Sequence, residues 1–559
     1  LPVLSVLGTF ARGTTTLSHV AHVRLKESDR VSAMLQLNRM GGRLELAGDR
    51  LVCHGVAGLN GADLSSFNDH RVLMSLAVAA TRAEGESRLT YPHAYRISYP
   101  RFLQEMAAVG LSMDVESRGL VPGLTVPAGA PAAESAGSPA RAALVPIGDQ
   151  VRRWSLDRPE AAAVVEVGAA ASGPEDRVLT WQELDHRADQ VATFLLGLGV
   201  GPGEPVAYQL PNCRQFVVLT LAALRIGAVC CPLMPIFRGR EMAFMLSRSQ
   251  ARVLVVPDRF RGRDYPSEVA DLVASEGTRA GAQRASLSHV VVVGGRGPWA
   301  AAPRSAITSA APPDLRWHDW AEAVEGREPD EAALTARVPG PDALAQLLFT
   351  SGTSGEPKGV LHRMSTLTLA AAMEVRHLGL NEVDRVYVPS PLAHQTGFLY
   401  GMWLAWVLGA PQILQATWDG RVALAALRRS RGTFVQAATP FLADLTQAAE
   451  EAGERPEALR IFVATGAAVP RGLAERATRT LGAAVCGAWG TTESCLGSLS
   501  SPGDEPAKTW GTDGRALEGV KLRVTDDDGR TLAAGQEGNF EVKSKCLFEG
   551  YLDHPEWTA

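Results

Sequence analysis

The sequence lacks the features that mark secreted, membrane-spanning and nucleic-acid-binding proteins. Its seven cysteines are scattered and form no C-x-x-C pair, which favours reduced thiols in a cytoplasm. A net charge of −5 gives no general reason to expect nucleic acid or an anionic membrane as a partner. The first residues lack the basic leading region of a signal peptide. The most apolar stretch, residues 216–237, contains Arg225, Gly227 and two prolines, so we expect a buried helix followed by a strand there and no membrane span.

The chain divides into two patterned regions joined by a linker. At 559 residues it is too long for one hydrophobic core. Residues 117–143 are rich in Pro, Gly, Ala and Ser without periodicity, a composition that cannot bury enough surface to fold. We therefore expect one domain over residues 1–116, a linker over 117–143, and a second domain or set of domains over 144–559.

Helical and strand patterns alternate in both regions. In the first, residues 31–40 and 71–83 have helical spacing, and residues 43–52 indicate a strand, a turn and a second strand. In the second, Thr180 is the expected N-cap of an amphipathic helix, and residues 205–210 and 253–256 are expected to be short strands. This alternation predicts an α/β protein with a mostly parallel sheet covered by helices on both faces.

Residues 347–360, LLFTSGTSGEPKGV, are the stretch most informative about function. After an apolar strand end they supply hydroxyls, glycines that let backbone N–H groups approach a polyanion, and one cation. The order differs from the P-loop pattern because the lysine precedes the last glycine. An ordinary polar turn is the alternative. The residues predicted to bind a triphosphate are Thr350, Ser351, Gly352, Thr353, Ser354, Gly355 and Lys358.

Three later motifs agree with a nucleotide site. His394 follows an expected strand, residues 464–470 (ATGAAVP) form a small-residue turn suited to a flat base, and residues 489–493 read WGTTE. An aromatic ring can stack on adenine, a threonine can bond a phosphate, and a carboxylate can hold Mg²⁺. Trp489 alone is more often a core residue and Glu493 alone more often a solvated charge; their joint occurrence favours the site.

In this order and at these separations, TSGTSGEPKG, GAAVP and WGTTE resemble the adenylate-forming (AMP-dependent) acyl-CoA synthetase and ligase superfamily over about residues 144–559. The resemblance implies a large α/β domain with mixed and parallel sheets. It also implies that a small-molecule carboxylic acid is activated with ATP and Mg²⁺ to an acyl-adenylate and then passed to coenzyme A. The implied roles are phosphate binding by residues 350–355 and Lys358, an adenine slot lined by Gly466, Ala467 and Ala468, stacking by Trp489 beside Gly490 and Thr491, α-phosphate binding by Thr492, Mg²⁺ binding by Glu493 with Thr350, and an acyl-pocket border at His394.

Two further expectations rest on this resemblance. The last residues are similar to the family just before its Thr-Gly-Asp segment, so we expect the chain to lack the small C-terminal domain with the adenylation lysine, and to turn over weakly or not at all. Residues 391–401 and 416–445 resemble ligases for cyclohexanecarboxylate and related alicyclic or medium-chain acids. We expect a neutral pocket around Gly397, Ala437, Ala438, Thr439 and Phe441, with plain sheet packing as the alternative.

The first region carries two dense charged clusters, LKESDR at 25–30 and FNDHR at 67–71. Solvated loops with salt bridges are one interpretation. The other is a site for an anionic substrate, with Lys26, Arg30 and Arg71 as binding residues and Glu27 as the proton-transfer group.

These strings resemble the C-terminal part of 5-enolpyruvylshikimate-3-phosphate (EPSP) synthase, which implies a truncated domain of βαβαββ repeats over about residues 1–115. By that resemblance Glu27 is a catalytic acid/base, and Arg30 and Arg71 bind phosphoenolpyruvate. Ile97 stands where that family has a lysine, so we expect a degenerate carboxyvinyltransferase-like domain.

Together the two regions suggest a ligase for a shikimate-derived ring acid. The alternatives are a carboxyvinyltransferase-related protein with an accessory nucleotide-binding domain, and a non-catalytic nucleotide- or acyl-binding fragment. The sequence leaves the acid and the oligomeric state open.

Overall fold

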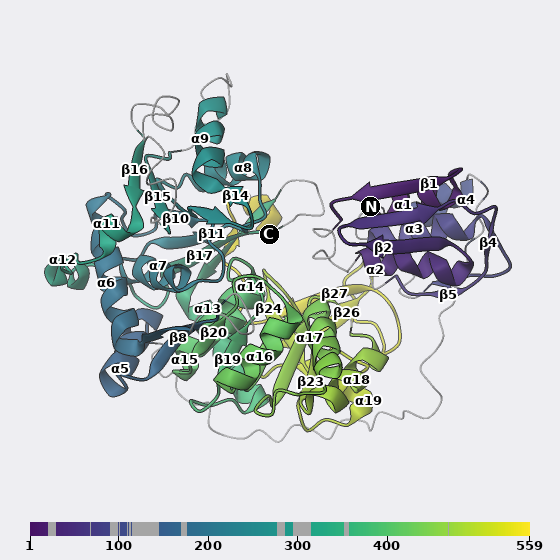
Figure 1. Cartoon of the computed structure of the whole chain (residues 1–559). Coiled ribbons are helices and arrows are strands. Elements are labelled where there is room, and N and C mark those ends of the chain that lie inside the picture. Colours follow the sequence, from purple (N-terminus) through teal and green to yellow (C-terminus); the bar gives the residue numbers. More distant parts are fainter. Residues whose placement is uncertain are drawn as a thin grey trace.

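The computed structural model describes residues 1–20, 30–66, 69–89, 95, 99, 101–108, 110, 113, 145–168, 176–276, 286–294, 315–350, 357–467 and 469–558 (Figure 1). The predicted linker, the loop at 351–356, and Lys26, Glu27, Ile97 and Ala468 lie outside these residues.

The first region is built on a three-stranded antiparallel sheet in the order β1-β3-β2. Strands β2 (Arg43–Ala47) and β3 (Arg50–His54) form the predicted strand–turn–strand, and Gly48 in the turn has φ +61°, where glycine is favoured. The other elements are α1 (Pro2–Phe10), β1 (Thr14–Ser18), α2 (Arg30–Met34), η2 (Leu35–Met40), β4 (Leu59–Asn60), β5 (Asp63–Leu64), α3 (His70–Ala80), β6 (Ala83–Glu84), β7 (Arg88–Leu89) and α4 (Phe102–Ala108).

An eight-stranded sheet begins the second region, in the order β16-β15-β12-β10-β11-β17-β18-β28. Its first six strands are parallel, and β18 and β28 join antiparallel. The near-continuous valine runs in β12 and β15 are typical of parallel strands buried on both faces. The bounds are β10 (Pro205–Tyr208), β11 (Val229–Pro232), β12 (Val253–Pro257), β15 (His289–Val293), β16 (Arg316–Asp319), β17 (Leu344–Thr350), β18 (Lys358–Arg363) and β28 (Gly550–Tyr551).

A nine-stranded sheet follows, in the order β25-β24-β23-β22-β21-β19-β20-β8-β9. Its central strands are parallel, while the strands at both ends are antiparallel. The bounds are β8 (Ala162–Glu166), β9 (Arg177–Thr180), β19 (Val386–Val388), β20 (Gln412–Leu414), β21 (Phe434–Ala438), β22 (Ile461–Thr465), β23 (Ala484–Thr491), β24 (Cys495–Leu499) and β25 (Arg515–Ala516); the two-stranded pairs are β13 (Arg259–Phe260) with β14 (Arg263–Asp264) and β26 (Lys521–Thr525) with β27 (Asn539–Lys543).

Helices connect these strands. Helix α6 (Trp181–Gly197) begins as predicted at Thr180, whose hydroxyl accepts from the Glu183 N–H at 3.2 Å while Glu183 accepts from the Thr180 N–H at 2.9 Å. The others are α5 (Ile147–Asp157), α7 (Arg214–Arg225), α8 (Gly239–Ser249), α9 (Tyr265–Glu276), α11 (Trp320–Val324), α12 (Glu331–Thr335), α13 (Met364–Leu378), α14 (Gln395–Gly397), the π-helix η4 (Phe398–Trp403), α15 (Leu404–Leu408), α16 (Gly420–Ser430), α17 (Thr439–Ala452), α18 (Arg471–Leu481), α19 (Pro506–Thr509) and α20 (Pro555–Thr558).

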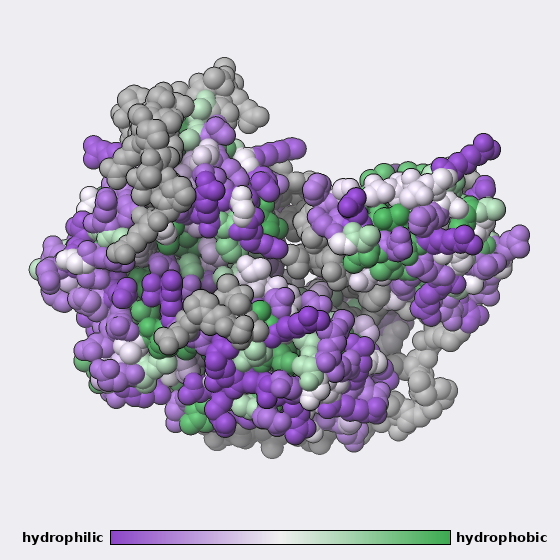
Figure 2. Space-filling model, in the orientation of Figure 1, coloured by the Kyte–Doolittle hydropathy of each residue, from purple (hydrophilic) through white to green (hydrophobic). Residues whose placement is uncertain are grey.

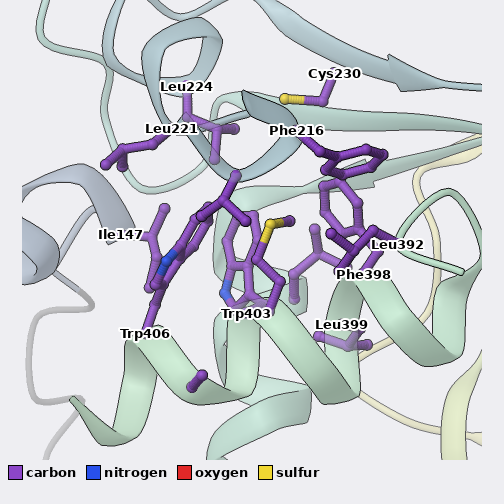
Figure 3. Close-up of a cluster of buried hydrophobic side chains, with 14 of the residues drawn as sticks. Ile147, Phe216, Leu221, Leu224, Cys230, Leu392, Phe398, Leu399, Trp403 and Trp406 are labelled. Carbon is purple, nitrogen blue, oxygen red and sulfur yellow. The ribbon is translucent and has the colours of Figure 1, made fainter. Parts of the chain in front are cut away.

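The largest core lies where helices from the two halves of this region meet. Trp403 and Trp406 point from η4 and α15 toward Leu221 and Leu224 of α7, and Phe398 lies beside Phe216 (Figure 3). The two indole rings are tilted at 48° with centroids 5.9 Å apart. Close packing of such large side chains fixes η4 and the residues just before it.

The predicted α/β class is confirmed, and so are the mixed and parallel sheets that the family resemblance implied. The alternating pattern alone indicated a mostly parallel sheet and left open how the strands divide between two sheets, because periodicity identifies strands without saying which pair. The apolar stretch at 216–237 is the predicted buried helix and strand, α7 and β11. All seven cysteines are free and buried. Within the described ranges, no helix is long and apolar enough to cross a bilayer, and hydrophilic residues cover much of the visible face in Figure 2.

Candidate nucleotide site

The predicted phosphate loop connects two antiparallel strands. Thr350 ends β17 and Lys358 begins β18, and the two residues are direct cross-strand partners. The Thr350 hydroxyl donates to the Lys358 carbonyl at 3.5 Å. Ser351, Gly352, Thr353, Ser354 and Gly355 lie outside the described residues. The hairpin therefore places the hydroxyl at one end of the loop opposite the cation at the other end.

A tight turn between β23 and β24 carries Thr492 and Glu493. The Ser494 N–H donates to the Thr491 hydroxyl at 3.1 Å, and Cys495 at the end of the turn has φ +57°. Gly490 is required just before the turn, because a Cβ there would lie 2.2 Å from the Cys495 carbonyl oxygen. The turn leaves Thr492 and Glu493 half-buried at the end of the sheet.

Tyr551, on β28, contacts both halves of the predicted site. Its hydroxyl donates to Oε1 of Glu493 at 2.8 Å. The ammonium of Lys358 lies 5.0 Å from the centre of the Tyr551 ring and 5.2 Å from that of Trp557. Residues 135 positions apart in the sequence are thus joined through one side chain, as expected if Lys358 and Glu493 share one site.

His362 supports the same turn from β18. Its Nε2 donates to the Thr492 carbonyl at 2.6 Å, and its side chain is fully buried. Burial lowers the pKa of this imidazole below its ordinary value, so the ring is neutral at neutral pH with the proton on Nε2.

The oxygen donors present fit a magnesium ion. Glu493 offers a carboxylate and Thr350 a hydroxyl, both of which are ligands for hard cations. Among the described residues no group of three or more His, Cys, Asp and Glu side chains gathers to enclose a metal. Mg²⁺ is usually held by one or two carboxylates together with water and phosphate oxygens.

Of the predicted adenine-binding residues that the structure describes, Gly466 and Ala467 follow β22, and Trp489, Gly490 and Thr491 lie on the neighbouring strand β23. Gly466 follows β22 with φ +81°, and nothing lies within 4 Å of a Cβ built on it, so open space faces this turn. The Ala467 carbonyl accepts from the Thr439 hydroxyl at 3.4 Å. Trp489 is half-buried and meets Phe540 edge-on, with ring centres 4.7 Å apart.

His394 caps the short helix α14. Its Nδ1 accepts from the Thr396 N–H at 3.2 Å, which leaves Nε2 to carry the proton of the neutral ring. The side chain of His394 is exposed on one side, and the protein packed around the rest of it removes part of its hydration. This desolvation lowers the pKa of the imidazole. Of the residues predicted to line a neutral acyl pocket, Gly397 and Ala437 are buried, whereas Ala438, Thr439 and Phe441 are partly exposed.

In the first region, one described residue of each charged cluster meets the other. Nε of Arg30 donates to Asp69 at 2.8 Å, and both side chains are buried, at 5% and 0% exposure. Asp69 also caps α3 by accepting from the N–H groups of Arg71 at 2.9 Å and Val72 at 3.3 Å. The Arg71 residue is exposed. Lys26 and Glu27 lie outside the described residues.

Comparison with known families decides the assignment of the second region. Residues 151–552 match the AMP-binding enzyme family.

The chain belongs to the AMP-binding enzyme family.

Relatives within this family activate acids of several kinds. The medium-chain fatty-acid–CoA ligase of Escherichia coli (strain K12) is 32% identical over 380 residues, which are 68% of this chain and 62% of that protein. The salicyl-AMP ligase / salicyl-S-ArCP synthetase of Mycobacterium tuberculosis is 31% identical over 418 residues, 73% of this chain and 66% of that protein. The chain thus spans just under two thirds of the length of these relatives.

Solved structures of the family share the fold. A crystal structure of the anthranilate CoA ligase AuaEII with anthranoyl-AMP matches with a TM-score of 0.62 at 23% identity, covering 74% of this chain and 72% of that one. The N-terminal domain of FACL13 from Mycobacterium tuberculosis matches with a TM-score of 0.60, covering 93% of that chain.

A second family matches the first region of this AMP-binding enzyme. Residues 1–106 match EPSP synthase (3-phosphoshikimate 1-carboxyvinyltransferase). The 3-phosphoshikimate 1-carboxyvinyltransferase of Methanococcus aeolicus is 38% identical over 117 residues, 21% of this chain and 27% of that protein. The predicted resemblance of both regions is confirmed.

Two residues of the site, Tyr551 and His362, were not predicted from the sequence. His362 is one of three basic residues in β18, which reads KGVLHR, and no local pattern distinguishes it. Tyr551 offered a weak signal, because it stands with Trp557 in an aromatic-containing tail, GYLDHPEWT.

Proposed function

We propose that the second region binds MgATP and activates a carboxylic acid as an acyl-adenylate, which is then transferred to the thiol of coenzyme A. The observation that carries this proposal is the contact of Tyr551 with both Lys358 and Glu493, because it brings a phosphate-type cation and a magnesium-type carboxylate to one place. Membership of the AMP-binding family supports the same chemistry.

The proposed roles follow the chemistry of each group. Residues 350–355 and Lys358 hold the β- and γ-phosphates; Gly466, Ala467, Ala468 and Trp489 line the adenine site beside Gly490 and Thr491; and the Thr492 hydroxyl donates to the α-phosphate. Glu493 and Thr350 hold the metal. Bound Mg²⁺ would neutralise charge on the phosphate oxygens.

No protein nucleophile is needed in this reaction. The substrate carboxylate attacks the α-phosphorus, the bond to the bridging oxygen breaks, and pyrophosphate leaves toward Lys358. Donors already in place around the α-phosphate meet the charge that develops there, and such preorganised groups usually contribute the largest share of catalysis. In the second half-reaction the thiol sulfur attacks the acyl carbon and AMP leaves.

We propose an alicyclic acid of the cyclohexanecarboxylate type, or a medium-chain acid, as the substrate. The identity to the E. coli medium-chain ligase supports an apolar acyl group. The acyl group would lie beyond His394, where the described Gly397, Ala438, Thr439 and Phe441 offer no charged side chain.

For the first region we propose a degenerate carboxyvinyltransferase-like domain. The match to EPSP synthase supports it, and Arg71 at the start of α3 remains exposed to an anionic ligand. Lys26, Arg30 and Glu27 are its other proposed site residues.

Calorimetric titration of the whole chain with ATP and Mg²⁺ tests the central proposal. We expect binding, weakened roughly tenfold or more by Lys358→Ala, because a charge-assisted contact to phosphate is lost. Lys543→Ala, which removes an exposed lysine from β27, is the matched control and should leave the affinity unchanged. Failure of the wild-type chain to bind MgATP would overturn the proposal.

Pyrophosphate exchange then tests the acid. Cyclohexanecarboxylate, octanoate and palmitate are compared as substrates for ATP–pyrophosphate exchange. Weak stimulation by the first two is expected, whereas a preference for palmitate would contradict the proposed acyl class.

A further inference from the structure

The segment from 548 to 558 ties the two halves of the nucleotide site together. The Phe548 N–H donates to the Glu493 carbonyl at 2.7 Å, and the Leu552 N–H donates to the Gly359 carbonyl at 2.8 Å. Between these bonds, β28 pairs antiparallel with β18, with Tyr551 opposite Val360. The backbone therefore holds Tyr551 at a fixed position between the Lys358 strand and the Glu493 turn.

Two aromatic rings surround the Lys358 ammonium. Tyr551 and Trp557 lie 5.0 and 5.2 Å from it, and their rings meet edge-on at 78° with centres 6.3 Å apart. Trp557 is in turn stacked on His554, at 3.7 Å and 7°. A cation within about 6 Å of an aromatic ring is attracted to its face, so these rings restrict a side chain that has four rotatable bonds.

The hydroxyl of Tyr551 holds the carboxylate. It donates to Oε1 of Glu493 at 2.8 Å, and both residues are half-buried. A hydrogen bond of this kind fixes the orientation of a carboxylate and leaves the other oxygen available to a metal. Groups that orient metal ligands in this way often change metal affinity about 10- to 100-fold when they are removed.

We propose that Tyr551 is a positioning residue that prepares both charged groups for MgATP, its hydroxyl orienting Glu493 for the metal and its ring, with Trp557, holding Lys358 for the phosphates. This inference rests on the proposed function, because it assigns Tyr551 to the same site. It separates the two effects within one residue: the hydroxyl acts on the metal, and the ring acts on the lysine.

Tyr551→Phe removes the hydroxyl and keeps the ring. Calorimetry measures ATP affinity of the whole chain over a range of Mg²⁺ concentrations and with EDTA. We expect the half-saturating Mg²⁺ concentration to rise about tenfold, while affinity for metal-free ATP changes by less than about twofold because the ring still contacts Lys358.

Trp557→Leu tests the ring half of the proposal. Removing one of two rings should weaken ATP binding by about two- to fivefold, equally with and without Mg²⁺, because only the lysine is affected. Tyr265→Phe is the matched control, because it likewise deletes a tyrosine hydroxyl that donates a hydrogen bond, in this case to the Pro235 carbonyl at 2.9 Å. It should leave the ATP affinity and the half-saturating Mg²⁺ concentration unchanged.

The outcomes separate the proposals. If the wild-type chain binds MgATP but Tyr551→Phe keeps the wild-type Mg²⁺ dependence, the positioning role is wrong and the proposed function stands. If the wild-type chain binds no nucleotide, the proposed function itself fails. Should Tyr551→Phe unfold at a lower temperature than Tyr265→Phe, the decision passes to Trp557→Leu, for which an unchanged ATP affinity would overturn the proposal.

Discussion

The imidazole of His362 donates from Nε2 to the backbone carbonyl of Thr492 across 2.6 Å. The bond links β18, which begins at Lys358, to the turn that carries Glu493. His362 is fully buried, and its Nδ1 has no hydrogen-bond partner in the part of the chain that the structure describes. The neutral ring donates the hydrogen bond that the Thr492 carbonyl accepts, whereas a protonated ring would bring an uncompensated charge into the interior.

This relationship predicts acid sensitivity of the folded state. Burial lowers the pKa of His362 below its ordinary value of 6.5 in the folded state, so below that pH the unfolded chain binds the proton more readily. Stability is retained above about pH 6.5 and is lost as the pH falls, by up to about 1 kcal/mol per pH unit. Urea unfolding at pH 7.5, 6.5 and 5.5 measures this loss.

Two variants separate the proton from the hydrogen bond. His362→Gln keeps a donor for the Thr492 carbonyl but does not titrate, so its stability should depend less on pH than that of the wild type. His362→Leu leaves that carbonyl unsatisfied and should cost about 1–3 kcal/mol at pH 7.5. A His362→Gln variant with the pH dependence of the wild type would refute the assignment.

A methyl group at Gly490 should disturb the metal-binding turn. Its Cβ would lie 2.2 Å from the Cys495 carbonyl oxygen, so the backbone of the turn must shift. We expect Gly490→Ala to weaken MgATP binding roughly tenfold or more, because a small displacement of a binding group costs much of its interaction. Gly472→Ala, in helix α18 where a Cβ meets nothing within 4 Å, is the control and should keep full affinity. Equal affinities for the two variants would show that the turn tolerates displacement.

The buried carboxyl group of Glu374 predicts the opposite pH dependence, a loss of folding stability as the pH rises. Its carboxyl group is fully buried in α13, and burial raises its pKa well above the ordinary value of 4.5. Because the folded-state pKa is the higher one, stability is fully present below pH 4.5 and declines as the pH rises toward the folded-state pKa. Glu374→Gln should therefore gain stability relative to the wild type as the pH rises from 4.5 toward the folded-state pKa, by up to about 1 kcal/mol per pH unit. Denaturant unfolding across this range measures the gain, and parallel curves for the two proteins would contradict the buried neutral carboxyl group.

The buried ion pair of the first region should be costly to break. Asp69→Asn removes the buried carboxylate that accepts from Nε of Arg30 at 2.8 Å, and breaking a buried pair by removing one partner costs about 3–5 kcal/mol. Glu86→Gln removes a partner from the exposed Glu86–Arg88 pair and should cost less than about 1 kcal/mol. Limited proteolysis of the whole chain compares the two, with faster cleavage within residues 1–113 expected only for Asp69→Asn. Similar cleavage of both variants would show that the pair contributes little.

The features that could be predicted from the sequence are those that depend on residues close together in the chain. Thr180 caps α6 because the capping box needs only residues three positions apart, and β2 and β3 follow from alternation around one glycine turn. Glu493 and Lys358 were chosen for their chemical types within short motifs. Their positions in the structure depend on how the strands are ordered in two sheets, because Lys358 begins β18 of the eight-stranded sheet and Glu493 follows β23 of the nine-stranded sheet, and periodicity does not encode this order.

The contacts that the sequence could not reveal are all long-range. Tyr551 meets Glu493 only because β28 adds to β18, and His362 meets Thr492 only because β18 ends near the turn between β23 and β24. The charged clusters at 25–30 and 67–71 left open ligand binding or solvated loops with salt bridges, and the structure buries the Arg30–Asp69 pair instead. Burial, which distinguishes a structural ion pair from an exposed one, is a property of the packed chain.

The late position of β28 has a consequence for synthesis on the ribosome. Lys358 emerges about 190 residues before Tyr551, a delay of roughly 10 to 40 s at ordinary elongation rates. During that interval the outer edge of β18 has no β28 to pair with, and an unpaired edge invites association with other strands. A nascent chain of this protein therefore stays vulnerable to mispairing until β28 emerges.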